Sequence, residues 1–247
     1  MIVENGPPPS VHDVLANGLA TVVFQPIVDL TTLRVFAYET LVRCAGFPSP
    51  VNLIEAAAKA NLTGRLGRRI RELALAGCPD HGLFLNIDPT EFDEGWLVRP
   101  DDPIFTHDHT IHLEITEGVP LSHYRHCHGV LHEIRRRGAR VAVDDLGAGF
   151  SNLKYIADLE PEIVKLDRGL VENLHKNPRM QVLVETMVVM CERLGAKVIA
   201  EGIETEEELK AAADAGVHYG QGYLIARPAA VPPKIDATHL LKVVQSA

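Results

Sequence analysis

Residues 110–144 read TIHLEIT-EGVP-LSHYRHCHGVLHEIRRR-GA-RVAVD, which is the pattern of a strand, a helix and a second strand. Thr110 to Thr116 and Arg140 to Asp144 are short runs rich in β-branched residues, which are typical of strands. The apolar residues from Leu121 to Arg137 have helical spacing. Because parallel strands need a crossover helix between them, this stretch predicts an α/β fold.

The same alternation continues on both sides of this unit. We predict eight strands, at Thr21 to Asp29, Val35 to Val42, Leu83 to Asp88, Thr110 to Thr116, Arg140 to Asp144, Glu162 to Lys165, Lys197 to Ala200 and Val217 to Tyr219. Helical patterns lie at Val51 to Ala60, Gly64 to Ala76, Leu121 to Arg137, Pro178 to Leu194 and Glu206 to Ala215. Only Leu30 to Arg34 separate the first two strands, too few residues for a crossover, so these strands should pair antiparallel. The pattern favours a TIM-like (β/α)8 barrel with one antiparallel strand over an open doubly wound sheet.

Composition narrows the class of protein. With 46% hydrophobic and 23% charged residues, the 247-residue chain can bury a sizeable core, which excludes a disordered or fibrous protein. Its formal net charge of −9 argues against binding to a DNA or RNA polymer, which needs a basic face. No secretion signal and no apolar run of about 18 residues is present, so we predict a cytoplasmic protein without membrane contact.

We divide the chain into three parts. Residues 1–19 are predicted to form an N-terminal leader with a short helix that Ser10 caps and Gly18 ends. Residues 20–228 form the barrel domain. Residues 229–247 form a C-terminal tail with a short helix at Thr238 to Val244.

A polar residue closes most of the predicted strands. Because the chemistry of a TIM-like barrel takes place at the carboxyl ends of its strands, these residues should converge on one rim. They are Glu39, Asn86, Glu114, Asp144, Asp145, Lys165, Glu201 and Gln221. Any one of them alone is as well explained by an ion pair or a loop cap, but together and in register they indicate a functional site.

Five of these residues are carboxylates, and two carboxylates about 4 Å apart repel by about 4 kcal/mol even at an effective dielectric constant of 20. Protonation or the ammonium of Lys165 would offset part of this repulsion. Carboxylate and amide oxygens are also hard ligands that suit Mg²⁺ or Mn²⁺, so we predict a divalent-cation site with two ions bridged by one Asp. Such a site favours in-line hydrolysis of a phosphodiester, with Lys165 orienting or deprotonating the attacking water.

A series of motifs resembles one known family. Glu39-Thr-Leu-Val-Arg43 resembles the signature of the EAL domain, whose members hydrolyse the bacterial second messenger cyclic di-GMP. The other motifs are Phe24-Gln-Pro-Ile27, Asn86, Leu113-Glu-Ile-Thr-Glu117, Asp144-Asp-Leu-Gly-Ala-Gly149, Lys165-Leu-Asp167, Ala200-Glu-Gly-Ile-Glu204 and Gln221-Gly-Tyr223. They follow the order of the family over about residues 20 to 228, and such an ordered set is far more specific than any one motif.

The resemblance implies a barrel with one reversed strand that converts cyclic di-GMP to linear pGpG with two Mg²⁺ or Mn²⁺ ions. It implies that Glu39, Asn86, Glu114 and Asp144 hold one ion, and that Asp144 bridges to a second ion also held by Asp145. The remaining roles also transfer by position. Lys165 and Glu201 would position the attacking water, Gln221 would support the site, Glu117 would brace the loop after Asp145, and Gln25, Arg43 and Asp167 would contact the nucleotide.

This sequence departs from the family at several positions. Thr40 replaces the Ala of the signature, Asp88 stands where Ser is commoner, and Leu146, Ala148, Phe150 and Asn152 replace the usual residues of the loop after Asp145. All predicted metal ligands are retained. In the family this loop couples dimerisation to the second metal site, so we expect any homodimer to use it. The alternative function is a catalytically silent receptor of cyclic di-GMP, and a weaker third hypothesis is an interaction scaffold.

Other features have a simpler explanation. His123, His126, His128 and His132 have partly helical spacing, but a solvated face is a better interpretation than a zinc site because no further ligand completes the set. The basic runs Arg65 to Arg71 and Arg135 to Arg140 lack interleaved aromatic residues and are interpreted as solvated surface. Gly147 and Gly149 are expected to supply special backbone angles for a tight loop rather than a phosphate cradle.

Overall fold

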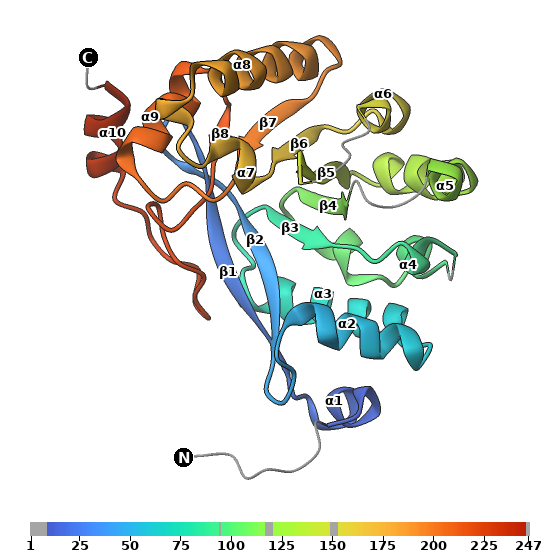
Figure 1. The fold of residues 1–247 in the computed structure, drawn as a ribbon. Helices are drawn as coiled ribbons and strands as arrows, with labels where there is room; N and C mark the ends of the chain where they lie inside the picture. The colour runs from blue at the N-terminus through green and yellow to red at the C-terminus, as the bar shows by residue number, and fades with distance from the viewer. Residues whose placement is uncertain (1–8, 94, 117–120, 149–152, 246–247) are drawn as a thin grey trace, which may run out of the picture.

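Eight strands close into one barrel in chain order in the computed structural model, which describes residues 9–93, 95–116, 121–148 and 153–245 (Figure 1). The strands are β1 (Ala20–Asp29), β2 (Val35–Cys44), β3 (Leu83–Asn86), β4 (Ile111–Thr116), β5 (Arg140–Leu146), β6 (Ile163–Leu166), β7 (Lys197–Ala200) and β8 (Tyr219–Gly220). β1 is antiparallel to both of its neighbours, β2 and β8, and all other neighbouring strands are parallel. The predicted TIM-like barrel with one antiparallel strand is confirmed.

Helices surround the barrel (Figure 1). The long helices are α2 (Pro50–Lys59), α3 (Thr63–Gly77), α5 (Leu121–Arg136), α8 (Pro178–Arg193) and α9 (Glu206–Asp214), and the sequence predicts each of them to within one residue. The short segments have too few residues to show a helical period: α4 (Thr90–Asp93), α6 (Lys154–Leu159), α7 (Arg168–Val171), and the 3-10 turns η1 (Trp96–Val98), η2 (Pro103–Thr106) and η3 (Leu174–Lys176). Within the described ranges, none of the helices is both long and apolar enough to span a membrane.

Two terminal helices pack against the barrel domain. α1 (Val11–Asn17) begins after Ser10, whose side chain accepts a hydrogen bond from the first turn, and ends at Gly18, which has a left-handed φ of 64°. α10 (Ala237–Gln245) packs on α9 and buries Leu240. Each helix therefore has an apolar face covered by the barrel domain.

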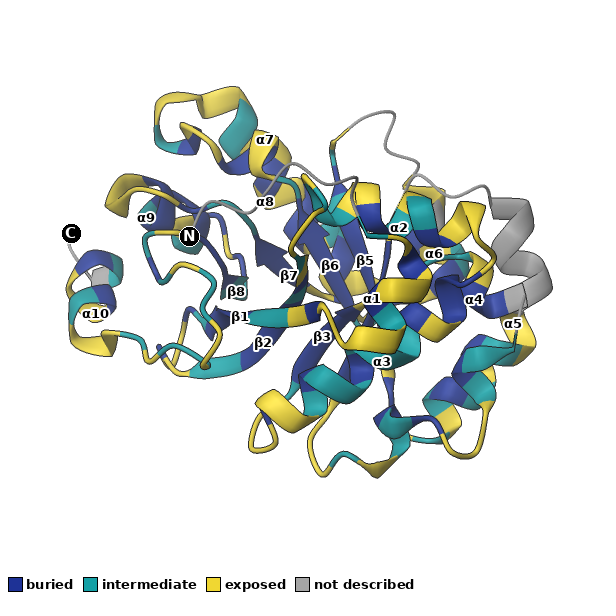
Figure 2. Ribbon diagram, turned by 90° about the horizontal axis from the view of Figure 1, so that it is seen from below, coloured by how far each residue is buried: buried dark blue, intermediate teal, exposed yellow. Residues whose placement is uncertain are grey.

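An apolar layer fills one end of the barrel interior. It consists of Ile27, Ala37, Phe84, Ala142, Ile163 and Ile199, and the ring of His112 stacks on that of Phe84. Most strand residues are accordingly coloured as buried in Figure 2, whereas the exposed residues lie mainly on the outer faces of the helices and in the connecting loops. This layer forms the floor beneath the polar residues described next.

Candidate active site

The alternation of side chains along a strand places the predicted site residues directly above the apolar layer. Residues two positions apart point to the same face of a strand. Seven predicted site residues each lie two positions after a residue of the apolar layer or one packed against it. In chain order they are Glu39, Asn86, Glu114, Asp144, Lys165, Glu201 and Gln221, and the residues two positions before them are Ala37, Phe84, His112, Ala142, Ile163, Ile199 and Tyr219. The structure thus brings these residues together at the carboxyl ends of the parallel strands, as the sequence predicts.

Lys165 lies at the centre of this polar layer. Its Nζ is 2.5 Å from Oε1 of Glu114, 2.7 Å from Oε1 of Glu201, 3.0 Å from Oδ1 of Asp144 and 3.6 Å from Oε1 of Glu39. Lys165 and Glu114 are each only 1% exposed. The buried ammonium is therefore balanced by several carboxylates at once.

The protonation equilibria of the cluster reflect its burial and its charges. Burial alone would lower the pKa of Lys165, but the surrounding carboxylates outweigh it and raise this pKa well above its ordinary value. Burial raises the pKa of Glu114 against the opposing effect of Lys165, and it raises the pKa of Glu201 to about 8. The pKa of Asp145 is also raised, by burial and by repulsion from Asp144. One ammonium does not neutralise all these carboxylates.

Two amide side chains connect the carboxylates. Nε2 of Gln221 donates to Oε2 of Glu39 at 2.5 Å and to Oε1 of Gln25 at 3.2 Å. Nδ2 of Asn86 donates to Oε2 of Glu114 at 3.0 Å. The Oε1 atom of Gln221 is buried and accepts no hydrogen bond from any residue that the structure describes.

An irregular turn brings the two aspartates of β5 to the same cluster. In a regular strand Asp144 and Asp145 would point to opposite faces. The register between β5 and β6 shifts after Val143, and Asp145 has a left-handed φ of 58°. Carboxylate oxygens of Asp144, Asp145 and Glu201 consequently lie within 4.8 Å of one another. Gly147 has a φ of 105°, which agrees with its predicted role in a tight turn.

The residues present fit a site for hard divalent cations. The donors are carboxylate oxygens in excess of the nearby positive charge, together with amide oxygens, and no sulfur ligand is among the candidate residues. Such a set suits Mg²⁺ or Mn²⁺ and does not suit a soft metal ion. The unpartnered buried oxygen of Gln221 adds a further acceptor in the same layer.

A cavity of about 300 Å³ opens beside the cluster. Among its lining residues are Gln25, Glu39, Asp167, Glu201, Gln221 and Tyr223. Arg43 is exposed, donates to the carbonyl of Val42 at 2.8 Å and is not part of this lining. The structure therefore brings Gln25 and Asp167 to the cavity but leaves Arg43 beyond it on β2.

Among the cavity residues that were not predicted site residues, three have charged or aromatic side chains. Arg168 pairs with Glu204 at 2.8 Å, and the guanidinium of Arg227 lies 4.2 Å from the ring centre of Tyr223. Arg168, Glu204 and Tyr223 all line the cavity. Their position in the sequence could have indicated them, because each lies within three residues of a predicted site residue, at the carboxyl end of a strand.

The interpretation of Arg65 to Arg71 as solvated surface is wrong for Arg71. Arg71 is 1% exposed and pairs with Glu91 and Asp102, at 2.7 Å and 2.9 Å. It lies four residues after Gly67 and three before Ala74, on the face of α3 that packs inward, so its helical position overrides its charge.

Some predicted residues fall outside the described part of the chain. They are Glu117, Gly149, Phe150 and Asn152, and the side chains of His123 and His126 are likewise not described. His128 and His132 are exposed on α5. The predicted homodimer contact through the loop after Asp145 stays a prediction.

The fold and the acidic site around Lys165 place this chain among TIM-like barrels that carry a polar site at the carboxyl ends of their strands. Comparison with known families identifies the kind of barrel. The EAL domain pattern matches residues 10–228, and the chain belongs to the EAL domain family.

Curated relatives are similar to this chain over most of its length. The chain is 32% identical over 221 residues to the cyclic di-GMP phosphodiesterase PA2567 of Pseudomonas aeruginosa, covering 83% of this chain and 38% of that protein. It is 29% identical over 239 residues to the cyclic di-GMP phosphodiesterase RocR of the same organism, covering 89% and 61%. The chain spans about a third of the length of the first curated relatives that it matches.

Solved structures share the fold. Klebsiella pneumoniae BlrP1, in a complex with manganese and cyclic di-GMP, is 30% identical with a TM-score of 0.74, covering 88% of this chain and 58% of that chain. An EAL domain protein from Listeria monocytogenes is 24% identical with a TM-score of 0.77, covering 98% and 97%, which supports the fold alone.

Proposed function

We propose that this chain hydrolyses cyclic di-GMP to linear pGpG with two Mg²⁺ or Mn²⁺ ions. The observation that carries the proposal is the position of Lys165, whose Nζ lies within 3.6 Å of four carboxylates in the buried polar layer. Nucleotide capture alone does not require such a group. The names of PA2567 and RocR, and the cyclic di-GMP bound in BlrP1, support the choice of substrate.

Five residues are proposed to hold the cations. Glu39, Asn86, Glu114 and Asp144 would hold one ion, and Asp144 and Asp145 the other. When bound, the ions would stabilise charge on the attacking and leaving oxygens of the phosphodiester. The all-oxygen donor set and the excess of negative charge support this assignment.

Lys165 and Glu201 are proposed to orient the attacking water and to receive its proton. Because the carboxylates raise the pKa of Lys165, its ammonium is a hydrogen-bond donor, which favours orientation of the water over its deprotonation by this residue. Glu201 lies 2.7 Å from Nζ of Lys165 and, in its ionised form, is the proposed proton acceptor. The oxygen of water then attacks phosphorus and the bond to a ribose 3′ oxygen breaks. That oxygen takes up a proton from solvent and leaves as the 3′ hydroxyl, and pGpG keeps the 5′ phosphate.

The cavity beside the cluster is the proposed nucleotide site. Gln25 and Asp167 line it next to Glu39 and are placed to contact the nucleotide. Gln221 would support the site through its hydrogen bonds to Gln25 and Glu39. Arg43 would bind a phosphate from the exposed rim by charge-assisted hydrogen bonds.

Chromatography of cyclic di-GMP after incubation with the purified chain tests the proposal. We expect pGpG with Mg²⁺ or Mn²⁺, none with EDTA, and a loss of at least about 100-fold in rate for Glu39→Ala and for Asp144→Ala, because each removes a proposed cation ligand. Glu72→Ala is the matched control, since Glu72 lies on the outside of α3 and pairs only with Arg68 and Arg69 among the described ion pairs. Unchanged rates in both site variants would contradict the cation assignment.

The receptor alternative predicts a different pair of results. A silent receptor would bind cyclic di-GMP in calorimetry but release no pGpG with either cation. A scaffold would neither bind the nucleotide nor gain thermal stability from it. The departures Leu146 and Ala148 in the turn after Asp145 are the observation that keeps the receptor alternative open.

A further inference from the structure

Arg71, Glu91 and Asp102 form a second buried ionic cluster, outside the barrel. Their exposed fractions are 1%, 2% and 0%. Nη1 of Arg71 donates to Oε2 of Glu91 at 2.7 Å, while its Nε and Nη2 donate to the two carboxylate oxygens of Asp102 at 3.2 Å and 2.9 Å. Buried ion pairs are seldom more stable than apolar residues of the same size, so stability alone does not account for this cluster.

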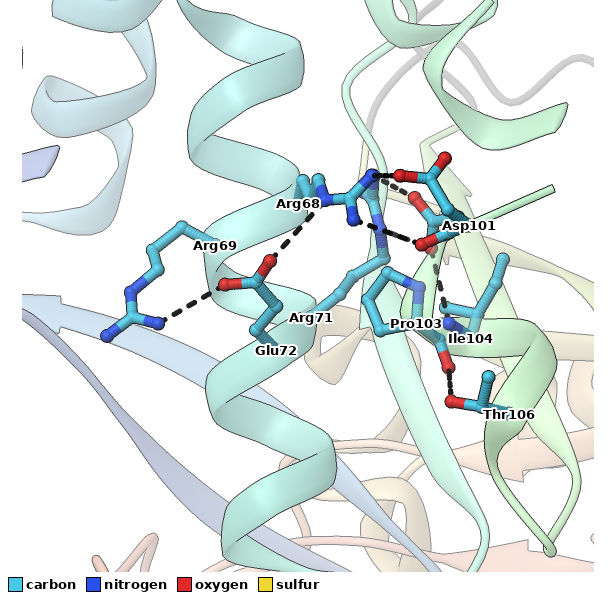
Figure 3. Close-up of polar contacts among 9 residues, drawn as sticks. Arg68, Arg69, Arg71, Glu72, Asp101, Pro103, Ile104 and Thr106 are labelled. Atoms are coloured by element: carbon cyan, nitrogen blue, oxygen red, sulfur yellow. Dashed lines mark hydrogen bonds and ion pairs between the residues drawn. The ribbon is translucent and has the colours of Figure 1, made fainter. Parts of the chain in front are cut away.

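The Asp102 arm of the cluster connects α3 to η2. Oδ1 of Asp102 also accepts a hydrogen bond from the backbone N–H of Ile104 at 3.2 Å. Arg68 and Arg71 both project from α3 toward this segment in Figure 3, and Arg68 pairs there with Asp101 at 2.9 Å. η2 carries none of the candidate site residues, so this arm has no direct connection to the site.

The Glu91 arm leads to a candidate cation ligand. Oε1 of Glu91 accepts a hydrogen bond from the backbone N–H of Asp88 at 3.4 Å, and the N–H of Glu91 donates to the carbonyl of Asp88 at 2.9 Å. Asp88 lies two residues after Asn86, in the turn between β3 and α4. Asn86, Asp88 and Glu91 line one cavity of about 230 Å³, together with residues of α2 and α3.

A glycine on α3 allows the carboxylate of Glu91 to reach this position. A Cβ atom on Gly67 would lie 2.4 Å from Oε2 of Glu91, so a larger residue there would displace the carboxylate. Arg71, one helical turn further along α3, holds the same oxygen. The carboxylate of Glu91 is therefore fixed between α3 and the turn that follows Asn86.

We propose that Glu91 is a positioning residue for Asn86, and that Arg71 holds Glu91 in place. The carboxylate fixes the β3–α4 turn, and this turn keeps Asn86 in register with its hydrogen-bond partner Glu114. The inference rests on the proposed function, in which Asn86 and Glu114 bind a divalent cation. The loss of the Glu91 carboxylate should therefore weaken cation binding, whereas the loss of the Asp102 carboxylate should not.

The test compares Glu91→Gln with Asp102→Asn, because each variant removes one carboxylate charge beside Arg71. Mn²⁺ affinity is measured by isothermal titration calorimetry on the whole chain without nucleotide, and thermal unfolding is followed with EDTA. We expect both variants to unfold at lower temperature. Only Glu91→Gln should lose Mn²⁺ affinity, by about tenfold or more. Equal Mn²⁺ affinity in all three proteins, or equal losses in the two variants, would overturn the proposal.

Two further variants keep the result interpretable. Gly67→Ala displaces the Glu91 carboxylate without removing a charge, and it should reproduce the loss of Mn²⁺ affinity even if Glu91→Gln does not fold. If a folded Gly67→Ala or Glu91→Gln variant binds Mn²⁺ normally while Asn86→Ala binds it more weakly, the positioning role of Glu91 is refuted but the cation assignment is not. Unchanged Mn²⁺ affinity in Asn86→Ala instead contradicts the cation assignment of the proposed function.

Discussion

Lys165 keeps its charge in the barrel interior because four carboxylates lie within 3.6 Å of its Nζ. An isolated ammonium at such a buried position would have a strongly lowered pKa. Without the ammonium, the carboxylates would repel one another at short range. Lys165 and a bound cation therefore relieve the same repulsion, and the removal of one should increase the effect of the other.

Lys165→Met should lower the free energy of unfolding of the cation-free protein by about 3 kcal/mol or more, because it leaves buried carboxylates without their partner. Mn²⁺ should then stabilise the variant more than the parent. Urea unfolding with EDTA and with Mn²⁺ measures both effects. Lys154→Met is the control, since Lys154 is exposed in an i,i+4 pair with Asp158 and should change stability by less than about 1 kcal/mol. Equal losses in the two variants would argue against the coupling.

His112 makes stability depend on pH. It is 3% exposed, its ring lies 4.2 Å from that of Phe84, and burial lowers its pKa to about 4. Unfolded histidine has a pKa near 6.5, so the unfolded chain binds the extra proton first as the pH falls, and stability drops by about 3 kcal/mol between pH 6.5 and pH 4. His112→Phe keeps an aromatic ring and should remove this loss. Urea unfolding at pH 7 and pH 4.5 measures it, and parallel losses in both proteins would contradict the assignment.

At the scale of single residues, period-2 alternation explains which site residues could be predicted. Glu114 and Lys165 each end an apolar run, so their position on the inner face follows from the pattern alone. Arg71 could not be predicted in the same way, because its burial depends on partners 20 and 31 residues away that the helical pattern of α3 does not reveal. The exposure of Arg43 could not be predicted either, because it depends on how far β2 (Val35–Cys44) extends past the cavity, whose lining does not include Arg43.

The turn at the end of β5 is the element on which the acidic cluster depends. Its positive φ values, 58° at Asp145 and 105° at Gly147, let two successive aspartates reach the same side. A Cβ atom at Gly147 would lie 2.6 Å from Cδ1 of Leu170, so this glycine is required both for its backbone angle and for the close approach of α7.

Gly147→Ala should therefore destabilise the protein more than Gly138→Ala. Gly138 also has a positive φ, of 93°, but a Cβ atom there meets no other atom within 4 Å. The difference in free energy of unfolding should be about 1 kcal/mol or more, because only Gly147→Ala adds a clash to the backbone strain. Urea unfolding measures the difference, and calorimetry with Mn²⁺ should show weaker binding only for Gly147→Ala. Equal behaviour of the two variants would mean that the turn tolerates a side chain.

Helices that repeat their apolar spacing over several turns can be predicted from the sequence, whereas elements fixed by tertiary contacts cannot. α3 and α8 span several turns, so their apolar residues recur often enough to define a helix. α4 has four residues and is held by the contacts of Glu91 with Asp88 and Arg71, which the local sequence does not show. The same limit applies to the turn after β5, whose composition indicates a turn but not the direction of Asp145.

At the scale of the whole molecule, the reversal of β1 completes the site. β1 closes the barrel between β2 and β8, so Gln25 lies beside Glu39 of β2 and Gln221 after β8. The short connection from β1 to β2 predicts that this pair is antiparallel, but the pairing of β1 with β8 joins residues about 190 positions apart and appears only in the closed fold.

Divalent cations should stabilise the whole fold through this one site. The chain has a formal net charge of −9, so any salt weakens the repulsion between its exposed carboxylates, and this general screening must be separated from binding. An ion that binds only the folded chain adds about 2.7 kcal/mol at 100 times its dissociation constant. Mn²⁺ should therefore raise the unfolding temperature above that in NaCl of equal ionic strength, and Asp144→Asn should lose this extra shift while it keeps the response to NaCl. Cyclic di-GMP is itself an anion, so it should stabilise the parent further only when a cation offsets the carboxylates. Ca²⁺ is the second cation to use, because it is present with cyclic di-GMP in a BlrP1 complex. An equal Mn²⁺ shift in Asp144→Asn would place the bound ions elsewhere on the acidic surface.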